Sequence, residues 1–205
     1  MISYLSNLIG NPYITTFIIS LIPTIELKGG IVFARGAGLD FFTALFVAFL
    51  GSTAVFFLIF FLLKPILGLL KRIKCFNGFA EKIENYFKKK ADSAVGDEKK
   101  SKGKLSENAL KFLSVLIFVA IPLPLTGVWT GTAVAVFLDM KFSHAALAVT
   151  VGNFIAGILI SLLAELCSVI GVNLDYVLYA LLALALIAVV ITVIKICKKP
   201  NGKEE

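Results

Sequence analysis

The sequence predicts an all-α membrane protein. We expect an inverted repeat, in which each copy is a re-entrant helical hairpin plus a transmembrane helix, with a further C-terminal transmembrane helix. Three observations lead to this fold: an apolar composition, stretches long enough to cross a bilayer, and a similarity between the two halves of the chain. Of the 205 residues, 59% are hydrophobic and only 16% are charged, whereas soluble domains carry about 25% charged residues. One integral membrane domain, residues 1–205, accommodates this length.

Three apolar stretches are long enough to span a bilayer, which takes about 20 helical residues. They are Phe41–Leu63, Phe142–Leu166 and Leu174–Ile196. Each of them ends at or beside a charged residue, as expected where a helix leaves the hydrocarbon core. We therefore predict three full transmembrane helices.

Two further apolar stretches are interrupted, and the first runs from Tyr13 to Gly38. Its break contains Pro23 and the pair Gly29 and Gly30. Each arm is too short to cross about 30 Å of hydrocarbon at about 1.5 Å per residue. Irregular backbone at membrane depth is tolerated where protein or a wet cavity covers it. We predict a re-entrant hairpin here, because the short arms favour it over two full spans.

The second interrupted stretch runs from Leu110 to Leu138 and has the same character. Its break contains Pro122, Pro124 and Gly127. Proline removes a helical hydrogen bond and ends the helix, so we predict a second re-entrant hairpin.

The basic residues predict the orientation of the chain. The segment from Lys64 to Lys111 holds 13 basic and 6 acidic residues, and this difference of +7 equals the net charge of the whole chain. By the positive-inside rule, the loop 65–109 and the lysine-rich C-terminus are cytoplasmic, and the protein lies in the cell membrane. Within the loop, Phe76–Val95 is predicted to be an amphipathic helix that binds anionic lipid headgroups. A nucleic-acid partner is not expected, because membrane-grade apolar sequence flanks the basic segment.

The two halves of the chain resemble each other when the sequence is shifted by 101 residues without a gap. Pro23 then coincides with Pro124, and Gly30 with Gly131. The predicted organisation is repeat 1 at about 12–64, the basic loop and amphipathic helix at 65–109, repeat 2 at about 110–166, and the C-terminal helix at 174–196. Inverted repeats whose broken helices meet at the bilayer midplane mark many transporters.

Glu26 is the strongest candidate for chemistry, because an ionisable group between two apolar arms is costly and usually functional. Burial favours the neutral carboxyl, whereas Lys28 and the N-terminus of the following helix favour the carboxylate. A carboxyl under these opposing influences can bind and release a proton, so we predict proton coupling at Glu26. The alternative is a cap at the start of the second arm, although a serine could cap without the cost of burial.

The remaining candidates are polar residues near the two breaks. Lys28 and Arg35 lie seven residues apart, on one helical face, and could bind a phosphate or carboxylate. Arg35 could instead extend to the outer membrane interface. The other predicted substrate-binding residues are Thr126, Trp129, Thr130 and Asn153. For these four, packing and interhelical hydrogen bonds are the more common roles.

No enzyme, metal or cofactor site is predicted. Cys75, Cys167 and Cys197 form no paired motif, so neither a disulfide framework nor a zinc site is indicated. Nucleophile–base arrangements, phosphate-binding loops and metal-ligand spacings do not occur. An ATP-driven pump or a hydrolase is therefore unsupported.

Two motifs resemble those of a known family. Pro23-Thr-Ile-Glu26-Leu-Lys-Gly-Gly30 and Ile121-Pro-Leu-Pro-Leu-Thr-Gly-Val-Trp-Thr-Gly131 look like the bacterial and archaeal small multidrug export protein family, which is similar to the DedA, or VTT-domain, superfamily. The resemblance covers roughly Thr15 to Ser161. One departure is Val32, where the family pattern leads us to expect proline.

The resemblance implies two facing re-entrant hairpins and proton-linked transport, with polyprenyl-phosphate carriers as substrates in some DedA members. Glu26 matches the acidic residue of the first motif, and Thr126, Gly127 and Trp129 match the second. We expect a secondary transporter for a small amphipathic substrate, including lipid phosphates. The alternatives are export of cationic lipophilic drugs and a non-transporting membrane scaffold. Bundles of this size with inverted repeats often form homodimers, and we keep a homodimer as an expectation.

Overall fold

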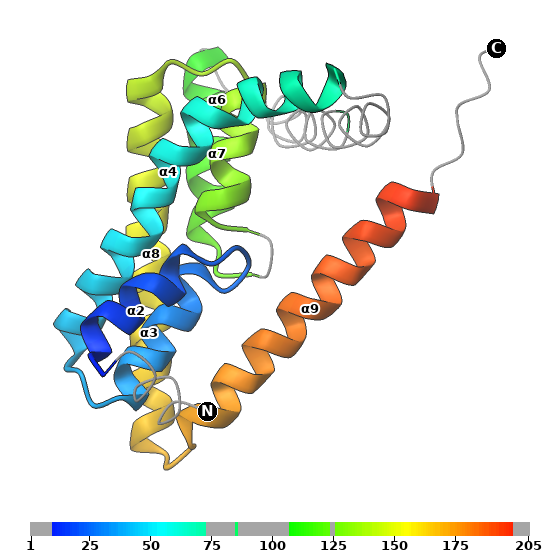
Figure 1. Ribbon diagram of the computed structural model, residues 1–205. Helices are drawn as coiled ribbons and strands as arrows, with labels where there is room; N and C mark the ends of the chain where they lie inside the picture. The colour runs from blue at the N-terminus through cyan, green and yellow to red at the C-terminus, as the bar shows by residue number, and fades with distance from the viewer. Residues whose placement is uncertain (1–9, 73–84, 86–106, 124–125, 199–205) are drawn as a thin grey trace.

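The computed structural model describes residues 10–72, 85, 107–123 and 126–198, and within these ranges the chain is helical without strands (Figure 1). Three helices, α4, α8 and α9, contain apolar segments of 26, 28 and 18 residues that can cross a membrane. The predicted all-α membrane fold is therefore confirmed. The helices are α2 (Pro12–Leu21), α3 (Glu26–Gly36), α4 (Phe41–Arg72), α6 (Glu107–Ala120), α7 (Val128–Phe137), α8 (Phe142–Val169) and α9 (Leu174–Lys198).

The short helices form two hairpins, α2–α3 and α6–α7, whose tips meet at the middle of the bundle (Figure 1). The first hairpin opens toward one end of the molecule and the second toward the other. Pro23 lies in the turn between α2 and α3, Pro122 follows α6, and Gly127 directly precedes α7. Pro124, also assigned to the second break, lies outside the described residues.

The assignment of Gly29 and Gly30 to the first break is wrong, because both are buried inside helix α3. The turn ends at Ile25, so these glycines belong to the second arm of the hairpin. A Cβ on Gly30 would overlap the Ser20 hydroxyl and lie 3.2 Å from the Ala48 Cβ. Gly30 therefore permits the close packing of α3 on α2 and α4, as small residues do between membrane helices.

Helix α4 is longer than predicted. It passes Leu63, where the sequence indicated an end, and continues through Pro65 to Arg72. Proline removes only one helical hydrogen bond, and membrane helices tolerate that loss when neighbouring groups compensate. The predicted cytoplasmic loop thus begins as helix. Its amphipathic segment, Phe76–Val95, lies outside the described residues except for residue 85.

The contact between a hairpin and the long helix that follows it occurs twice. A Cβ on Gly51 of α4 would lie 2.6 Å from the Phe17 carbonyl oxygen of α2, and a Cβ on Gly152 of α8 would lie 2.6 Å from the Leu116 carbonyl oxygen of α6. The two glycines are 101 residues apart (152 − 51 = 101), whereas Phe17 and Leu116 are 99 apart (116 − 17 = 99). A gapless shift is therefore wrong for the first arms, which correspond at an offset of 99 residues because the second break is longer than the first.

Helices α4 and α8 form the centre of the bundle and contact each other as well as the second arm of the other hairpin. The α4, α6, α7 and α8 helices enclose one core cluster, and α2, α3, α4 and α8 enclose another. The outward faces of α4 and α8 are lined with exposed side chains such as Phe46, Phe57, Leu147 and Leu162. Apolar side chains are stable on such a surface when lipid is the solvent.

Asp40 positions the start of α4. Its carboxylate accepts a hydrogen bond from the Thr43 backbone N–H at 3.0 Å, which is the geometry of a helix N-cap. Hydrogen bonds from Thr43 hold the pKa of this exposed carboxyl below its ordinary value. Asp40 is therefore the N-cap of α4.

Candidate functional site

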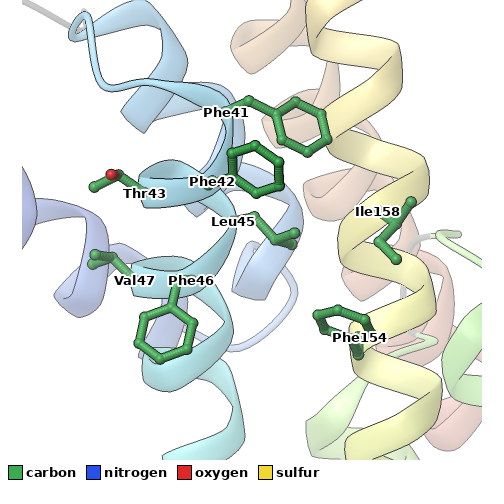
Figure 2. Close-up of a pocket in the computed structure, with 8 residues that line it drawn as sticks. All are labelled: Phe41, Phe42, Thr43, Leu45, Phe46, Val47, Phe154 and Ile158. Atoms are coloured by element: carbon green, nitrogen blue, oxygen red, sulfur yellow. The ribbon is translucent and has the colours of Figure 1, made fainter.

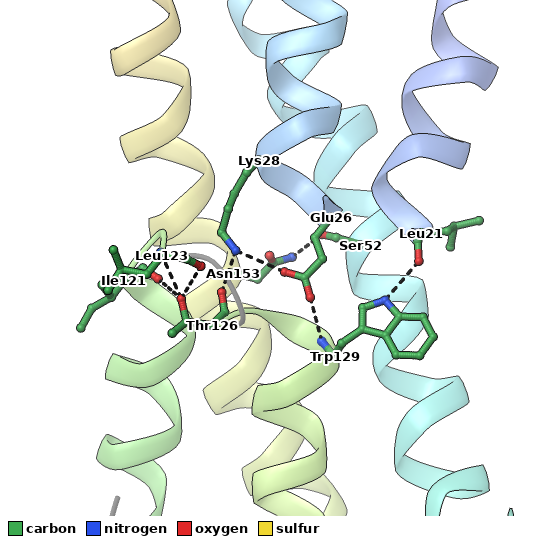
Figure 3. A network of polar contacts seen from close by, with 9 residues as sticks. All are labelled: Leu21, Glu26, Lys28, Ser52, Ile121, Leu123, Thr126, Trp129 and Asn153. Atoms are coloured by element: carbon green, nitrogen blue, oxygen red, sulfur yellow. Dashed lines mark hydrogen bonds and ion pairs between the residues drawn. The ribbon is translucent and has the colours of Figure 1, made fainter. Parts of the chain in front are cut away.

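Two helix N-termini meet where the hairpin tips touch. Helix α3 begins at Glu26 and helix α7 begins at Val128, and Figure 3 shows the two helices approaching from opposite sides. Each N-terminus carries a partial positive charge and free backbone N–H groups. Because both face the same point, the tips together favour a negative charge there.

Glu26 supplies that negative charge. The residue is only 5% exposed, and its Oε1 accepts a hydrogen bond from the Trp129 backbone N–H at 3.2 Å (Figure 3). The N-cap residue of α7 is Gly127, which has no side chain to cap with, so Glu26 caps this helix from the other hairpin. Glu26 also has a positive φ of 49°, which is unusual for a residue with a side chain and is often found at functional sites.

Lys28 balances the charge of Glu26. Its ammonium group lies 3.4 Å from Glu26 Oε2 and donates a hydrogen bond to the Thr126 carbonyl oxygen at 2.7 Å. Both side chains of the ion pair are 6% exposed. A charge in such surroundings is tolerated when it is paired. Lys28 therefore pairs with Glu26 within its own tip and joins that tip to the second one through the charge-assisted hydrogen bond to Thr126.

Gly127 leaves the space that the Glu26 carboxylate occupies. A Cβ at this position would overlap Glu26 Oε2 and lie 2.7 Å from the carboxyl carbon. The glycine has φ of 175°, an extended conformation that any residue adopts, so its requirement is steric. Positions 26 and 127 are also 101 residues apart. Glu26 of the first half therefore places its carboxylate where the side chain of its counterpart in the second half, position 127, would otherwise lie.

Thr126 and Trp129 hold the tips in place. The Thr126 hydroxyl contacts the Ile121 and Leu123 carbonyl oxygens at 2.6 and 2.8 Å and accepts a hydrogen bond from the Leu123 N–H at 3.1 Å. The Trp129 indole N–H donates to the Leu21 carbonyl oxygen at the end of α2, at 3.1 Å. The Thr126 hydroxyl therefore forms its hydrogen bonds within the second break. The backbone carbonyl oxygen of Thr126 faces the Glu26–Lys28 ion pair instead.

A cavity of about 260 Å³ adjoins the ion pair. Glu26, Trp129 and Thr130 line it together with apolar residues of the first tip, α4 and α7. The full set is Pro23, Thr24, Glu26, Ile59, Leu63, Trp129, Thr130 and Ala133. An apolar cavity that ends at one ionisable group fits an amphipathic ligand. Sequence reasoning missed Ile59, Leu63 and Ala133, which carry no polar signal.

Arg35 does not lie with Lys28. It is two helical turns away, near the C-terminal end of α3, where it forms an ion pair with Glu165 of α8. It also donates a hydrogen bond to the Leu39 carbonyl oxygen at 2.8 Å. The shared helical face was expected to bring Arg35 and Lys28 together, but a separation of seven residues is about 10 Å along a helix.

A larger apolar groove of about 570 Å³ lies between α4 and α8 on the surface of the bundle. Figure 2 shows its aromatic lining, which includes Phe41, Phe42, Phe46 and Phe154. Thr43 is the polar residue of the lining, and no ionisable side chain belongs to it. This groove suits a lipid acyl chain and offers nothing to bind a charged headgroup.

Asn153 lies inside the bundle and is 3% exposed. Its amide donates hydrogen bonds to the Ser52 and Thr53 hydroxyl oxygens of α4 at 2.7 and 3.0 Å. Ser52 and Asn153 are again 101 residues apart, so the two long helices cross at corresponding positions. These bonds occupy both amide hydrogens, and the direct role of Asn153 is to join α8 to α4.

Replacing Asn153 by alanine is expected to lower the free energy of unfolding by about 0.6–1.7 kcal/mol, the range of interhelical hydrogen bonds in membranes. Thermal unfolding in detergent measures this effect. The double variant with Ser52→Ala should lose less than the sum of the single losses, because the two residues share one bond. An additive loss would contradict this interaction.

A model of the family described as "Putative small multi-drug export protein" matches residues 26–159, which is more than half of the chain. The match begins at Glu26, the first residue of α3, and ends within α8, so it includes α4 and the second hairpin but not α2 or the turn that follows it. Comparisons with curated proteins and with solved structures gave no match.

Proposed function

We propose that this chain, which belongs to the small multi-drug export protein family, is a proton-coupled transporter of an amphipathic substrate with an anionic headgroup. The family description, an export protein, favours a transporter over an enzyme. One observation carries the finer proposal: the buried Glu26–Lys28 ion pair lies between two helix N-termini and beside an apolar cavity.

The charges of the site support proton coupling at Glu26. The ion pair is neutral as it stands, and the Glu26 carboxylate is the anion that the two helix N-termini favour. When Glu26 binds a proton, Lys28 and both N-termini remain without a negative partner. An anionic headgroup restores the balance by accepting hydrogen bonds from the Lys28 ammonium and the Trp129 N–H, the donors that Glu26 now holds. Proton and anion therefore bind together and leave together.

The cavity supports an amphipathic substrate. Ile59, Leu63 and Ala133 line the part away from the ion pair and can contact the apolar portion next to the headgroup. Trp129 and Thr130 lie between this apolar surface and Glu26. An inorganic anion would leave this surface unused, whereas a lipid phosphate uses both parts of the site.

We further propose that both hairpins are re-entrant and that the domain divides as the sequence predicts, with repeats at 12–64 and 110–166. By the positive-inside rule, the loop 65–109 and the C-terminus face the cytoplasm from the cell membrane. In this orientation the loop binds anionic lipid headgroups. A homodimer remains part of the proposal.

A second candidate is export of cationic lipophilic drugs, which the family description favours. In that case Glu26 would be the counter-ion of the drug. Lys28 already holds this position at 3.4 Å, so the drug would have to displace a buried ammonium group. The anionic substrate needs no such displacement, and we rank it first.

Lys28→Ala separates the two candidates. In liposomes with a lumenal pH indicator, lipid phosphate should drive proton flux through the unmodified protein. The variant loses one hydrogen bond to a charged group, about 1.5–3 kcal/mol, which corresponds to about tenfold to hundredfold weaker binding. Flux driven by a lipophilic cation should not fall.

The matched control is Lys141→Ala, which removes an exposed lysine and should leave the flux unchanged. Cation-driven flux that survives Lys28→Ala, without any response to polyprenyl phosphate, would support drug export instead. If neither substrate drives proton flux through the unmodified protein, the alternative of a non-transporting membrane scaffold takes the place of both candidates.

A further inference from the structure

Two ion pairs join the halves of the bundle with the charges reversed, and their members on the long helices occupy corresponding positions. Arg35, near the C-terminal end of α3, pairs with Glu165 of α8, and Asp139, just after α7, pairs with Lys64 of α4 at 2.6 Å. Lys64 and Glu165 are 101 residues apart (165 − 64 = 101). Each ion pair therefore ties the end of a hairpin's second arm to the long helix of the other half.

The two ion pairs lie at opposite ends of the molecule. Asp139 precedes the first residue of α8, Phe142, and Glu165 lies in the last turns of the same helix. The helix between Phe142 and Glu165 measures about 35 Å at about 1.5 Å per residue. The Glu26–Lys28 ion pair lies between these ends, where the hairpin tips meet (Figure 1). A substrate that crosses the molecule by this site must pass one ion pair at each end.

The cavity beside Glu26 extends toward only one of these ends. Leu63 and Ala133 line it, and they lie on α4 and α7 toward Lys64 and Asp139. The corresponding positions in the other half, by the same shift, are Ala164 and Val32.

Val32 and Ala164 are each 1% exposed. Both belong to a core cluster with Leu27, Ile31 and Ile160. The side of the site toward Arg35 and Glu165 is therefore closed by packed side chains, whereas the side toward Lys64 and Asp139 has a cavity.

We propose that a second substrate cavity opens on this closed side during transport, lined by Lys28, Val32, Ile160 and Ala164, and that the Arg35–Glu165 ion pair holds it shut in this structure. The proposal rests on the transport function, which requires access to Glu26 and Lys28 from both ends. Lys28 is the counterpart of Trp129 under the shift of 101 residues. The ammonium group would therefore line the second cavity as the indole lines the first.

Arg35 suits the entrance of a cavity for anions. Its side chain is 17% exposed, and the Glu165 side chain is 46% exposed, so the carboxylate is the partner nearer to the surface of the bundle. Among the residues that the structure describes, no acceptor contacts the buried Arg35 Nε. When Glu165 moves away, the guanidinium group remains at the opening with free donors. An anionic headgroup can accept hydrogen bonds from them on its way to Lys28.

Cysteine accessibility tests the second cavity. In a background with the native cysteines replaced, Val32→Cys and Ala133→Cys report on corresponding sides of the site. A membrane-impermeant thiol reagent is added from either face of sealed vesicles. We expect slow labelling of Val32→Cys alone, and at least tenfold faster labelling from the Arg35 face when Glu165→Gln is added. Lys64→Gln should instead accelerate Ala133→Cys from the opposite face.

Two controls separate opening from unfolding. Ala148→Cys, in the core and 0% exposed, should stay unlabelled in every background. The charge swap Arg35→Glu with Glu165→Arg should return Val32→Cys to its slow rate. The proposal is overturned if Glu165→Gln leaves the Val32→Cys rate unchanged, or if Ala148→Cys labels equally fast.

Proton flux in the same vesicles keeps the two proposals apart. If the parent protein shows proton flux but Glu165→Gln leaves the labelling rate of Val32→Cys unchanged, the second cavity is rejected and the transport function stays in place. A responsive Val32→Cys without any flux would reject the transport function.

Discussion

A methyl group at position 127 is expected to abolish transport and to lower the free energy of unfolding by about 2–3 kcal/mol, the upper range for overpacking a buried site. In Gly127→Ala the new Cβ overlaps Glu26 Oε2, so the carboxylate must leave its position. Helix α7 then loses its cap at Trp129 N–H, and Lys28 loses its partner. Thermal unfolding in detergent and proton flux in liposomes measure the two effects.

The control is Gly68→Ala, because a Cβ at Gly68 meets nothing within 4 Å. This helical position should gain slightly in stability, since alanine favours helix by up to about 1 kcal/mol over glycine. Adding Glu26→Asp to Gly127→Ala should recover stability, because the shorter side chain withdraws from the methyl group. It should not recover transport, because the shorter carboxylate no longer reaches Trp129. A fully active Gly127→Ala protein would show that the carboxylate need not lie where the structure has it.

Removing one member of the Glu26–Lys28 ion pair should cost more than removing both. Glu26→Gln leaves the Lys28 ammonium buried without its carboxylate, and Lys28→Met leaves the carboxylate without its ammonium. Breaking a buried ion pair in this way costs about 3–5 kcal/mol. The double variant carries neither charge and should be close to the parent in thermal stability. Transport should be absent in the two variants without Glu26, which lack the proton site, and at least about tenfold lower in Lys28→Met, which lacks one donor of the anion site.

An exposed ion pair provides the control for these single and double variants. Lys64 and Asp139 form an ion pair with side chains 57% and 79% exposed, and exposed ion pairs contribute little to stability. Lys64→Met and Asp139→Asn should therefore change the unfolding temperature only slightly. Additive losses at Glu26 and Lys28, as large in the double variant as their sum, would mean that the two charges do not interact.

Much of the fold could be predicted from the sequence, because its signals are local. The long helices follow from the length of apolar stretches, and α8 and α9 begin at the predicted residues Phe142 and Leu174. The turn at Pro23 follows from the missing N–H of proline. Gly29 and Gly30 misled the prediction, because a pair of glycines next to a charged residue resembles a break when its packing partners are unknown. In the structure Gly30 faces Ser20 and Ala48, which no local pattern announces.

The candidate site was predicted only in part. Glu26 and Lys28 could be singled out, because a charge between apolar arms has a cost that sequence alone reveals. Arg35 was named because it shares a helical face with Lys28, but its partner is Glu165, 130 residues later. Gly127 was assigned to the second break, but its packing against the Glu26 carboxylate was not predicted. The repeat offered a signal that could have found this contact, since positions 26 and 127 coincide under the shift of 101 residues.

The sequence by itself determined that the protein lies in a membrane, that helices break at Pro23 and Pro122, and that Glu26 and Lys28 bring charge to one break. Only the tertiary structure decided which groups meet: Lys28 with the Thr126 carbonyl and Glu26 with the Trp129 N–H, at separations of 98 and 103 residues. The physical reason is the range of the forces. Desolvation and helix geometry act on each segment separately, so their effects are visible along the chain. A cap or an ion pair between hairpins depends on close packing of whole helices, which is a property of the complete fold.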